Sequence, residues 1–298
     1  MKHSLLGLHC CLSLLTSCGP KPESSPPPTA DGGGELIDIG GRRLQLVTRG
    51  QGSPTVVIEA GMGEAGVDSG SWSAVIEEIS KANRVCIYNR AGLGKSDPAP
   101  KLPRTSQEVA NDLNALLTKA GVPGPYLLVG HSYGGLHIRM FASQYPEKVL
   151  GMVLVDTAHP DQDEKWLAAL PTPVPEEPES IREARKFLSG RKYPASNPEQ
   201  IDPTASEAQV RGARGIGAKP LVILSHSSKF RLDQRLPEDV SQKLENICQE
   251  LQADLKRISS TSTLLQSGSG GHYLQRQDPE LVIQGIRRAI DAVKQRSK

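Results

Sequence analysis

Short apolar runs alternate with longer amphipathic segments along most of the chain, from about residue 36 to the C-terminus. The short runs are rich in Val, Ile and Leu, as strands are, and they occupy residues 36–39, 44–48, 55–59, 84–88, 126–129, 149–155, 221–224 and 262–265. The longer segments repeat apolar residues at helical spacing, and they occupy about 105–120, 136–144, 237–258 and the stretch from 279 onward. Strands that alternate with helices in this way predict an α/β fold, with a mainly parallel sheet covered by helices on both faces.

The helix expected over 105–120 has recognisable ends. Thr105 and Glu108 are spaced as in a capping box, and Gly121 suits the C-terminal cap. The end signals therefore agree with the apolar spacing on where this helix begins and ends.

Residues from about 159 to 218 interrupt the alternation. This stretch contains eight of the 23 prolines, several acidic residues and only scattered apolar residues such as Trp166 and Phe187. We expect an inserted helical cap here rather than another strand–helix unit. A partly disordered surface excursion is the alternative.

The N-terminus has the pattern of a secretory signal. Lys2 and His3 precede an apolar run over 5–15 that is too short to span a bilayer. The run ends in Leu15-Thr16-Ser17-Cys18, which resembles the lipobox of bacterial lipoproteins. That resemblance implies that residues 1–17 are removed and that Cys18 is lipidated. A buried apolar helix with an incidental cysteine is the alternative.

The segment that follows Cys18 supports the interpretation of the N-terminus as a lipid anchor. Residues 18–35 are rich in Pro, Ser and Gly and have no apolar periodicity, which is typical of a flexible tether. We therefore divide the chain into a signal peptide over 1–17, a lipidated Cys and linker over 18–35, and a folded domain over 36–298 that carries the cap.

Composition and charge exclude several classes of protein. The 298 residues include 35 Lys and Arg against 33 Asp and Glu, whereas a nucleic-acid binder usually has a basic excess. Apolar residues make up 37% and charged residues 23%, enough for a sizeable core. No apolar run reaches 18 residues, so no transmembrane helix is expected.

The cysteines and histidines give no metal signal. The sequence has no CxxC or HxH spacing, so we expect no metal and no cofactor. Cys86 lies in an apolar strand and Cys248 in an amphipathic helix, and both are expected to be buried as small apolar side chains. Whether these two cysteines form a disulfide is left open by the sequence.

A candidate nucleophile lies between a strand and a helix. Gly130-His131-Ser132-Tyr133-Gly134 follows the strand expected over 126–129 and opens the next helix. A nucleophilic serine needs a sharp turn of this kind, with small residues around it, and the helix N-terminus stabilises negative charge beside it. A glycine-rich turn without chemistry is the alternative.

Four segments, in order, make the chain from about Leu36 to its C-terminus resemble the α/β-hydrolase superfamily. They are VIEAGMG at 57–63, YNRAGLGKS at 88–96, GHSYGG at 130–135, and Gly271-His272 followed by Asp278-Pro279-Glu280. The first stands where the family has its oxyanion turn, and the second resembles the family's D-x-R-G-x-G-x-S loop.

The chain departs from the family at the oxyanion turn. Many members have His-Gly there, where this chain has Ala60-Gly61 after Glu59. Because the oxyanion donors are backbone N–H groups, the oxyanion hole can still form. The contact that the usual histidine makes to neighbouring loops is expected to be missing.

The resemblance and the chemistry together suggest a role for each candidate residue. Ser132 would attack a carbonyl carbon, and its proton needs a base with a pKa near neutrality, which is a histidine. His272 lies in a Gly- and Ser-rich loop after the last strand, where the superfamily has its base. His226 and His159 lie near strand ends and remain alternatives. Of the other histidines, His3 and His9 lie in the signal. The side chain of His131 is expected to point away from the nucleophile, and that of His137 to pack within the following helix.

The acid that orients the base can come from either of two strand ends. Asp156 directly follows the strand over 149–155, where certain lipases and haloalkane dehalogenases carry their acid. The commoner superfamily position follows the next strand, and there the first acid is Asp233. We choose Asp156 and keep Asp233 as the alternative. The backbone N–H groups of Met62 and Tyr133 match the superfamily's oxyanion donors.

The resemblance implies a serine hydrolase that cleaves a carboxylic ester or a related small acyl compound through an acyl-enzyme. Ser132 argues against epoxide hydrolases and dehalogenases, which have an Asp nucleophile there. The alternatives are an amide hydrolase or aminopeptidase-like member, a cofactor-free haloperoxidase-like member, and a non-catalytic binding lipoprotein. With Cys18 lipidated, the folded domain would lie outside the cytoplasm on the bacterial cell envelope, with a membrane and a small substrate as partners and no nucleic acid.

Overall fold

The computed structural model describes residues 34–230 and 235–296. The predicted signal over 1–17, the predicted lipidation site Cys18 and all but the end of the predicted linker lie outside the described residues, as does Asp233. Within the described ranges, no helix combines the length and the apolar character needed to cross a bilayer.

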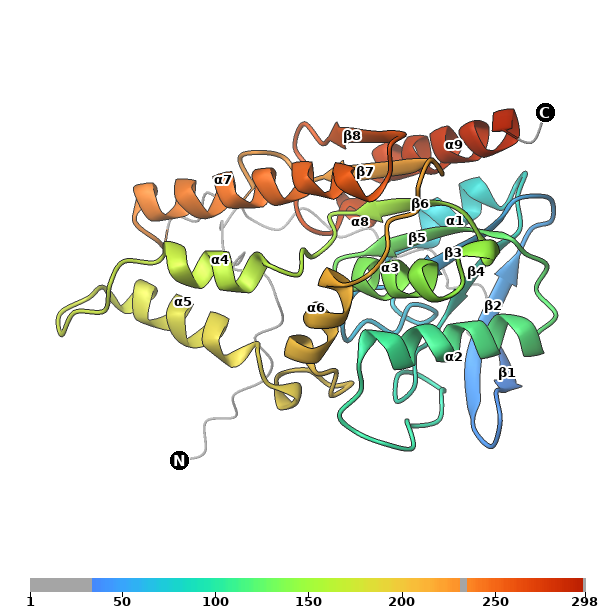
Figure 1. Cartoon of the computed structure of the whole chain (residues 1–298), viewed down its shortest axis with the longest axis horizontal. Helices are drawn as coiled ribbons and strands as arrows, with labels where there is room; N and C mark the ends of the chain where they lie inside the picture. The colour runs from blue at the N-terminus through green and yellow to red at the C-terminus, as the bar shows by residue number, and fades with distance from the viewer. Residues whose placement is uncertain (1–33, 231–234, 297–298) are drawn as a thin grey trace, which may run out of the picture.

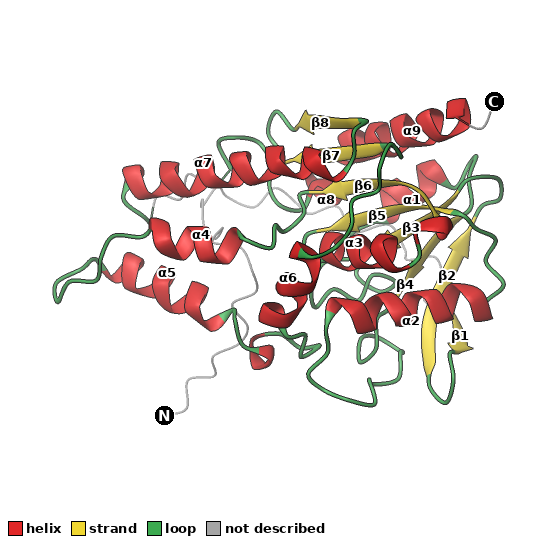
Figure 2. Ribbon diagram, in the orientation of Figure 1, coloured by secondary structure: helices red, strands yellow, loops and turns green. Residues whose placement is uncertain are grey.

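The described residues form an eight-stranded sheet at the centre of the domain (Figures 1 and 2). Its strands lie side by side in the order β1-β2-β4-β3-β5-β6-β7-β8, where β1 and β2 pair antiparallel and the strands from β4 to β8 run parallel. The bounds are β1 Glu35–Asp38, β2 Arg43–Arg49, β3 Thr55–Glu59, β4 Val85–Tyr88, β5 Tyr126–His131, β6 Val149–Val155, β7 Leu221–Ser225 and β8 Ser262–Gln266. The predicted mainly parallel α/β fold is therefore confirmed.

Helices cover both faces of the sheet (Figure 2). One face is covered by α2 (Ser106–Lys119) and α3 (Gly134–Gln144), and the other by α1 (Ser73–Ile79) and α9 (Pro279–Arg296). Successive strand residues point to opposite faces: in β3, Val57 joins the core under α2 and α3, whereas Val56 and Ile58 join the core under α1 and α9. The apolar runs of β3, β4, β5 and β7 are thus buried on both sides, whereas the edge strands β1 and β8 remain partly exposed.

The predicted capping box begins α2. The Glu108 carboxylate accepts the backbone N–H of Thr105 at 2.7 Å, and Ser106 is the first helical residue. Two short helices, α1 and α8 (Leu274–Gln277), were not predicted. α1 begins after Trp72 with no side-chain cap, so its start has no sequence signal.

The cap contains α4 (Gln162–Ala169), α5 (Glu179–Gly190) and α6 (Pro203–Arg211), all between residues 159 and 218. Helix α7 (Glu238–Asp254) joins α4 and α5 in a separate apolar cluster through Val240 and Cys248. At about 1.5 Å per residue α7 is roughly 25 Å long, and Leu255 at its far end packs in the sheet core. One helix therefore ties the cap to the sheet.

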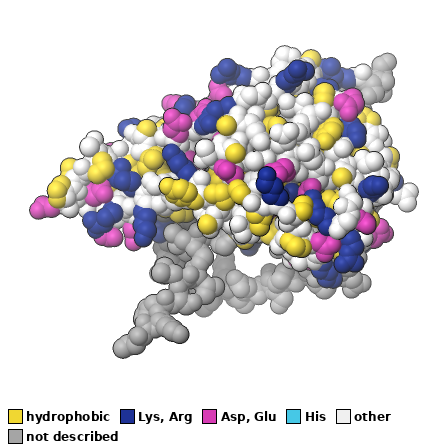
Figure 3. Space-filling model, turned by 60° about the horizontal axis from the view of Figure 1, so that its bottom comes forward, with side chains coloured by type: hydrophobic (Ala, Val, Ile, Leu, Met, Phe, Trp, Pro, Cys, Tyr) yellow, Lys and Arg dark blue, Asp and Glu magenta, His cyan; other side chains and the backbone are white. Residues whose placement is uncertain are grey.

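Cys86 and Cys248 are both buried, and no disulfide joins them. They belong to different clusters, Cys86 to the sheet core and Cys248 to the cap. On the face shown in Figure 3, basic and acidic side chains are interspersed. This matches the balanced charge of the sequence.

Candidate active site

Ser132 lies on a sharp turn between β5 and α3. Its φ of 52° is in the left-handed region, which is unfavourable for a residue with a side chain. Hydrogen bonds hold the turn: the Ser132 N–H donates to the carbonyl of Val155 at 3.1 Å, and the Thr157 hydroxyl donates to the carbonyl of Ser132 at 3.2 Å. The end of β6 and the residues just after it therefore hold the turn that presents Ser132.

The glycines after Ser132 allow α3 to begin against neighbouring backbone. A Cβ on Gly134 would lie 2.4 Å from the carbonyl oxygen of Glu59, and a Cβ on Gly135 would lie 1.6 Å from Oγ1 of Thr157. No side chain fits at either position. This close approach explains why small residues surround the serine in GHSYGG.

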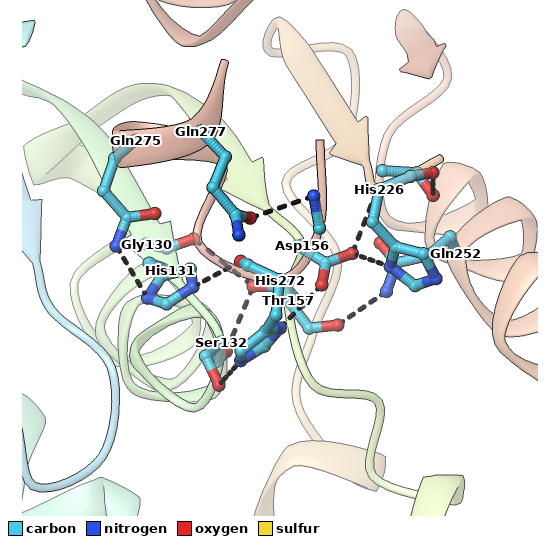
Figure 4. Close-up of polar contacts among 12 residues, drawn as sticks. Gly130, His131, Ser132, Asp156, Thr157, His226, Gln252, His272, Gln275 and Gln277 are labelled. Carbon is cyan, nitrogen blue, oxygen red and sulfur yellow. Dashed lines mark hydrogen bonds and ion pairs between the residues drawn. The ribbon is translucent and has the colours of Figure 1, made fainter. Parts of the chain in front are cut away.

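Ser132, His272 and Asp156 form one hydrogen-bonded chain (Figure 4). His272 Nε2 lies 3.0 Å from Ser132 Oγ, and His272 Nδ1 lies 2.6 Å from Asp156 Oδ2. Because a carboxylate only accepts, Nδ1 carries the hydrogen and Nε2 presents its lone pair to the serine hydroxyl. Three residues from three different loops thus meet in the order that the sequence predicts for nucleophile, base and acid.

The environment of Asp156 keeps its carboxylate ionised. The residue is 3% exposed, and burial by itself raises the pKa of a carboxyl. The attraction of His226 and the hydrogen bonds from His226 and His272 outweigh burial and hold the pKa of Asp156 well below its usual range. The negative charge opposite His272 is therefore present throughout the neutral pH range.

His226 directly follows β7 and contacts the acid rather than the nucleophile. Its Nδ1 lies 2.5 Å from Asp156 Oδ1, and its Nε2 lies 3.3 Å from the Glu245 carboxylate on α7. The other alternative base, His159, lies 3.3 Å from Asp254. Sequence reasoning identified neither the His226–Asp156 contact nor Glu245, since a lone acid within an amphipathic helix gives no signal.

His131, beside the nucleophile, supports the loop that carries His272. Its Nε2 lies 2.9 Å from the carbonyl oxygen of His272 and donates to it, and its Nδ1 lies 3.3 Å from the Gln275 amide. Burial raises the pKa of the nearby Glu64, but attraction to His131, whose Nδ1 lies 3.8 Å from the carboxylate, and a hydrogen bond from the Ser69 hydroxyl outweigh burial and lower this pKa to about 2. The side chain that points away from the nucleophile therefore contacts the backbone of His272.

The oxyanion turn presents Met62 next to Ser132. Met62 and Tyr133 line the same cavity as Ser132. Across the part of the chain that the structure describes, no hydrogen bond is found from the backbone N–H of Met62 or Tyr133 to another group of the protein. Both donors are thus available beside the serine.

A buried cluster of charged side chains holds the oxyanion turn, in which this chain has Ala60 instead of a histidine. Arg90 donates to the carbonyl oxygens of Ala60 at 2.7 Å and Gly61 at 2.6 Å. The same guanidinium pairs with Glu59 at 2.7 Å and with Glu199 of the cap at 2.6 Å. Glu199 also accepts the backbone N–H of Gly63 at 2.6 Å. Arg90, Glu59 and Glu199 together therefore join this turn to the cap.

Two cavities meet at Ser132 and His272. The one under the cap has a volume of about 80 Å³, and most of its walls are apolar side chains of the cap, of α7 and of the loop after β7: Trp166, Ala184, Phe187, Leu188, Phe230, Leu236, Leu244 and Cys248. The other, of about 210 Å³, includes the oxyanion turn and polar groups such as Glu64 and Asn197. Phe187 and Arg191, near the end of α5, line both cavities.

Among the described residues, no group of three or more His, Cys, Asp or Glu side chains is arranged to hold a metal ion.

Comparison with known proteins finds the same fold. Residues 54–279 match the family model of the alpha/beta hydrolase fold. The chain is 28% identical to the uncharacterized protein YqjL of Bacillus subtilis (strain 168), over 78% of this chain and 82% of that protein. It is 29% identical to the probable transporter efuK of Hormonema carpetanum over 86% of this chain, but it spans only 42% of that longer protein.

Among solved structures, the chain is similar to a thermophilic esterase from Thermogutta terrifontis. The superposition has a TM-score of 0.55 and covers 85% of this chain and 94% of the esterase, at 21% sequence identity. At this identity the likeness is one of fold.

Proposed function

Because this chain belongs to the alpha/beta hydrolase fold family, we propose that it is a serine hydrolase that cleaves a carboxylic ester or a related acyl compound through an acyl-enzyme. The observation that carries the proposal is the chain of hydrogen bonds from Ser132 through His272 to Asp156, at 3.0 Å and 2.6 Å. The thermophilic esterase has a similar fold, so the fold is one on which an ester can be cleaved.

The first half of the reaction follows from the geometry. As Ser132 Oγ forms a bond to the carbonyl carbon, His272 Nε2 accepts its proton. The carbonyl oxygen becomes negative and is stabilised by the N–H groups of Met62 and Tyr133. Asp156 stabilises the imidazolium of His272. The imidazolium then gives its proton to the leaving oxygen as the bond between that oxygen and the carbonyl carbon breaks.

The second half repeats these roles with water. His272 takes a proton from water as the water oxygen bonds to the acyl carbon, and then returns a proton to Ser132 Oγ as the acid leaves. The apolar cavity under the cap suits a hydrocarbon part of the substrate. A serine at the turn, rather than an aspartate, favours this route over epoxide opening or dehalogenation.

A fluorophosphonate probe tests the proposal, because it bonds covalently to an activated serine. We expect wild type to be labelled and peptide mass spectrometry to place the adduct on Ser132. Ser132→Ala should abolish labelling and ester hydrolysis while the melting temperature changes little. An unlabelled wild type that hydrolyses no ester would instead favour a non-catalytic binding protein on this scaffold.

We also propose that the domain is tethered to a bacterial cell envelope through a lipid on Cys18. The lipobox-like Leu15-Thr16-Ser17-Cys18 and the Pro- and Gly-rich segment after it support this proposal. A tether of this composition lets a folded hydrolase reach substrates near a membrane.

A further inference from the structure

The hydrogen-bonded chain at the site does not end at Asp156. It continues from Asp156 to His226, as Figure 4 shows, and from His226 to Glu245. Five side chains thus follow one another from the turn after β5 to α7. Asp156 is 3% exposed, and His226 and Glu245 are each 1% exposed. Burying an imidazole between two carboxylates is costly unless their charges and hydrogen bonds match.

We propose that His226 is a positioning residue for the proposed hydrolase reaction: it holds the Asp156 carboxylate so that Oδ2 faces His272. The inference rests on the function proposed above. His226 follows β7, close to where the commoner superfamily pattern has its acid. In this chain the end of β7 therefore supplies a hydrogen-bond donor, His226, to the acid that follows the neighbouring strand β6.

His226 fixes Asp156 with two donors. Its backbone N–H lies 3.2 Å from Asp156 Oδ1 and its ring Nδ1 lies 2.5 Å from the same oxygen. Oδ2 is thereby left to His272. Since a carboxylate can rotate about its terminal bond, two donors on one oxygen determine which oxygen meets the base.

The hydrogens that face Asp156 follow from the chemistry of its partners. Nδ1 of His226 and Nδ1 of His272 each face a carboxylate acceptor, so each carries a hydrogen. Asp156 therefore accepts one imidazole N–H on each of its two oxygens.

Neighbouring groups hold His226 in this orientation. The Gln249 amide donates to Glu245 Oε1 at 2.5 Å and so steadies the carboxylate beyond Nε2. The ring of Phe230 packs edge-on against the imidazole, with the ring centres 5.3 Å apart. The imidazole is thus held by Asp156 just after β6, by Glu245 on α7 and by Phe230 in the loop after β7.

Two variants separate positioning from packing. His226→Asn is smaller than histidine but keeps an N–H donor that can face Asp156, whereas His226→Leu is close to histidine in volume and has no donor. We expect His226→Leu to lower kcat for ester hydrolysis about 100-fold, the order seen for small misplacements of reacting groups, with KM changed less than about threefold. We expect the kcat of His226→Asn to be at least about tenfold higher than that of His226→Leu. The melting temperatures of the two variants should nevertheless fall by about the same amount.

His159→Leu is the matched control, because it removes another buried imidazole that contacts a carboxylate. Its kcat should stay within about threefold of wild type. Equal kcat for His226→Leu and wild type, or equal losses in the Asn and Leu variants, would overturn the proposal.

If His226→Leu does not fold, His226→Asn decides: a kcat within about tenfold of wild type supports the proposal, and a loss as large as that of Asp156→Asn overturns it. Failure of fluorophosphonate labelling in wild type would reject the proposed function itself, whatever the His226 variants do.

Discussion

At the scale of single residues, two members of the hydrogen-bonded chain have strained backbones. Ser132 and Asp156 have φ angles of 52° and 38°, and left-handed conformations of this kind cost about 1–3 kcal/mol each. Neighbouring strands offset the strain, since Asp156 N–H donates to the Leu224 carbonyl at 2.7 Å and Ser132 N–H donates to Val155 at 3.1 Å. Both side chains are thereby directed beyond the carboxyl ends of the sheet, where ligands collect in α/β folds.

Asp156→Asn tests the choice of acid. The amide has the shape of the carboxylate but no charge, and it favours the wrong tautomer of His272, so we expect kcat for an ester to fall by roughly 10³–10⁴. Asp233→Asn is the comparison and should change kcat little. The reverse result would place the acid after β7 and leave Asp156 a structural role.

Glu64 predicts a change of stability with pH. Its pKa is lowered to about 2 from a usual 4.5, so its ionised form stabilises the fold above pH 4.5, and this contribution is lost as the pH falls toward 2. Glu64→Gln should therefore unfold at lower urea concentration than wild type at pH 7, with a gap that narrows toward pH 3. Glu176→Gln changes an exposed acid and should show no gap at either pH. A gap for Glu64→Gln that is the same at both pH values would contradict the prediction.

At the scale of elements, the site depends on how closely α3 approaches its neighbours. Gly135→Ala puts a methyl group 1.6 Å from Thr157 Oγ1, so we expect a loss of about 3 kcal/mol in the free energy of unfolding, as in overpacked cores. Urea denaturation measures it. Gly212→Ala is the control, because its new Cβ would have no neighbour closer than 3.6 Å and should cost less than about 1 kcal/mol. Equal effects would mean that the helix start tolerates a shift.

The cap and the oxyanion turn are linked through one side chain. Glu199→Gln removes a charge from the buried cluster with Arg90 and weakens the acceptor of the Gly63 N–H, so the fold should lose roughly 3 kcal/mol of unfolding free energy. Because Met62 lies in the same turn, labelling of Ser132 by a fluorophosphonate should also slow by about tenfold. Glu176→Gln should alter neither quantity. Unchanged labelling in a destabilised Glu199→Gln would show that the cluster stabilises the fold without positioning the oxyanion donors.

At the scale of the whole molecule, the apolar side chains of residues 34–230 and 235–296 form three buried clusters. Two lie on the opposite faces of the sheet, and the third joins the cap helices α4 and α5 to α7. The candidate site lies where the sheet and the cap meet, since side chains from both line the apolar cavity beside Ser132. Access of a substrate is thus governed by parts of the chain that are distant in sequence.

The proposed anchor is tested on the full chain in a bacterial host. We expect wild type to partition into the detergent phase, and Cys18→Ser to accumulate as an uncleaved precursor, because lipid attachment precedes cleavage of such signals. Cys10→Ser, within the predicted signal, is the matched control and should be processed as wild type is. A mature wild-type chain that mass spectrometry shows to begin elsewhere than Cys18 would reject the anchor.

The sequence by itself determined the parallel sheet, because strands buried on both faces must be continuous apolar runs and their lengths are visible directly. It also determined that Ser132 follows β5, that Asp156 follows β6, and that His272 lies in the loop after β8. The capping box at Thr105 located the start of α2 for the same reason: each of these signals lies within a few residues of the feature it specifies.

Tertiary structure alone decided the contacts between residues that are distant along the chain. The pairing of Arg90 with Glu199 spans 109 positions, and that of Asp156 with His226 spans 70. Nothing local marks Glu245 or Glu199, since an acid in a helix or in a proline-rich loop is ordinarily solvated. Their burial follows only when α7 and the cap pack onto the sheet, because a charge taken out of water must then find a partner.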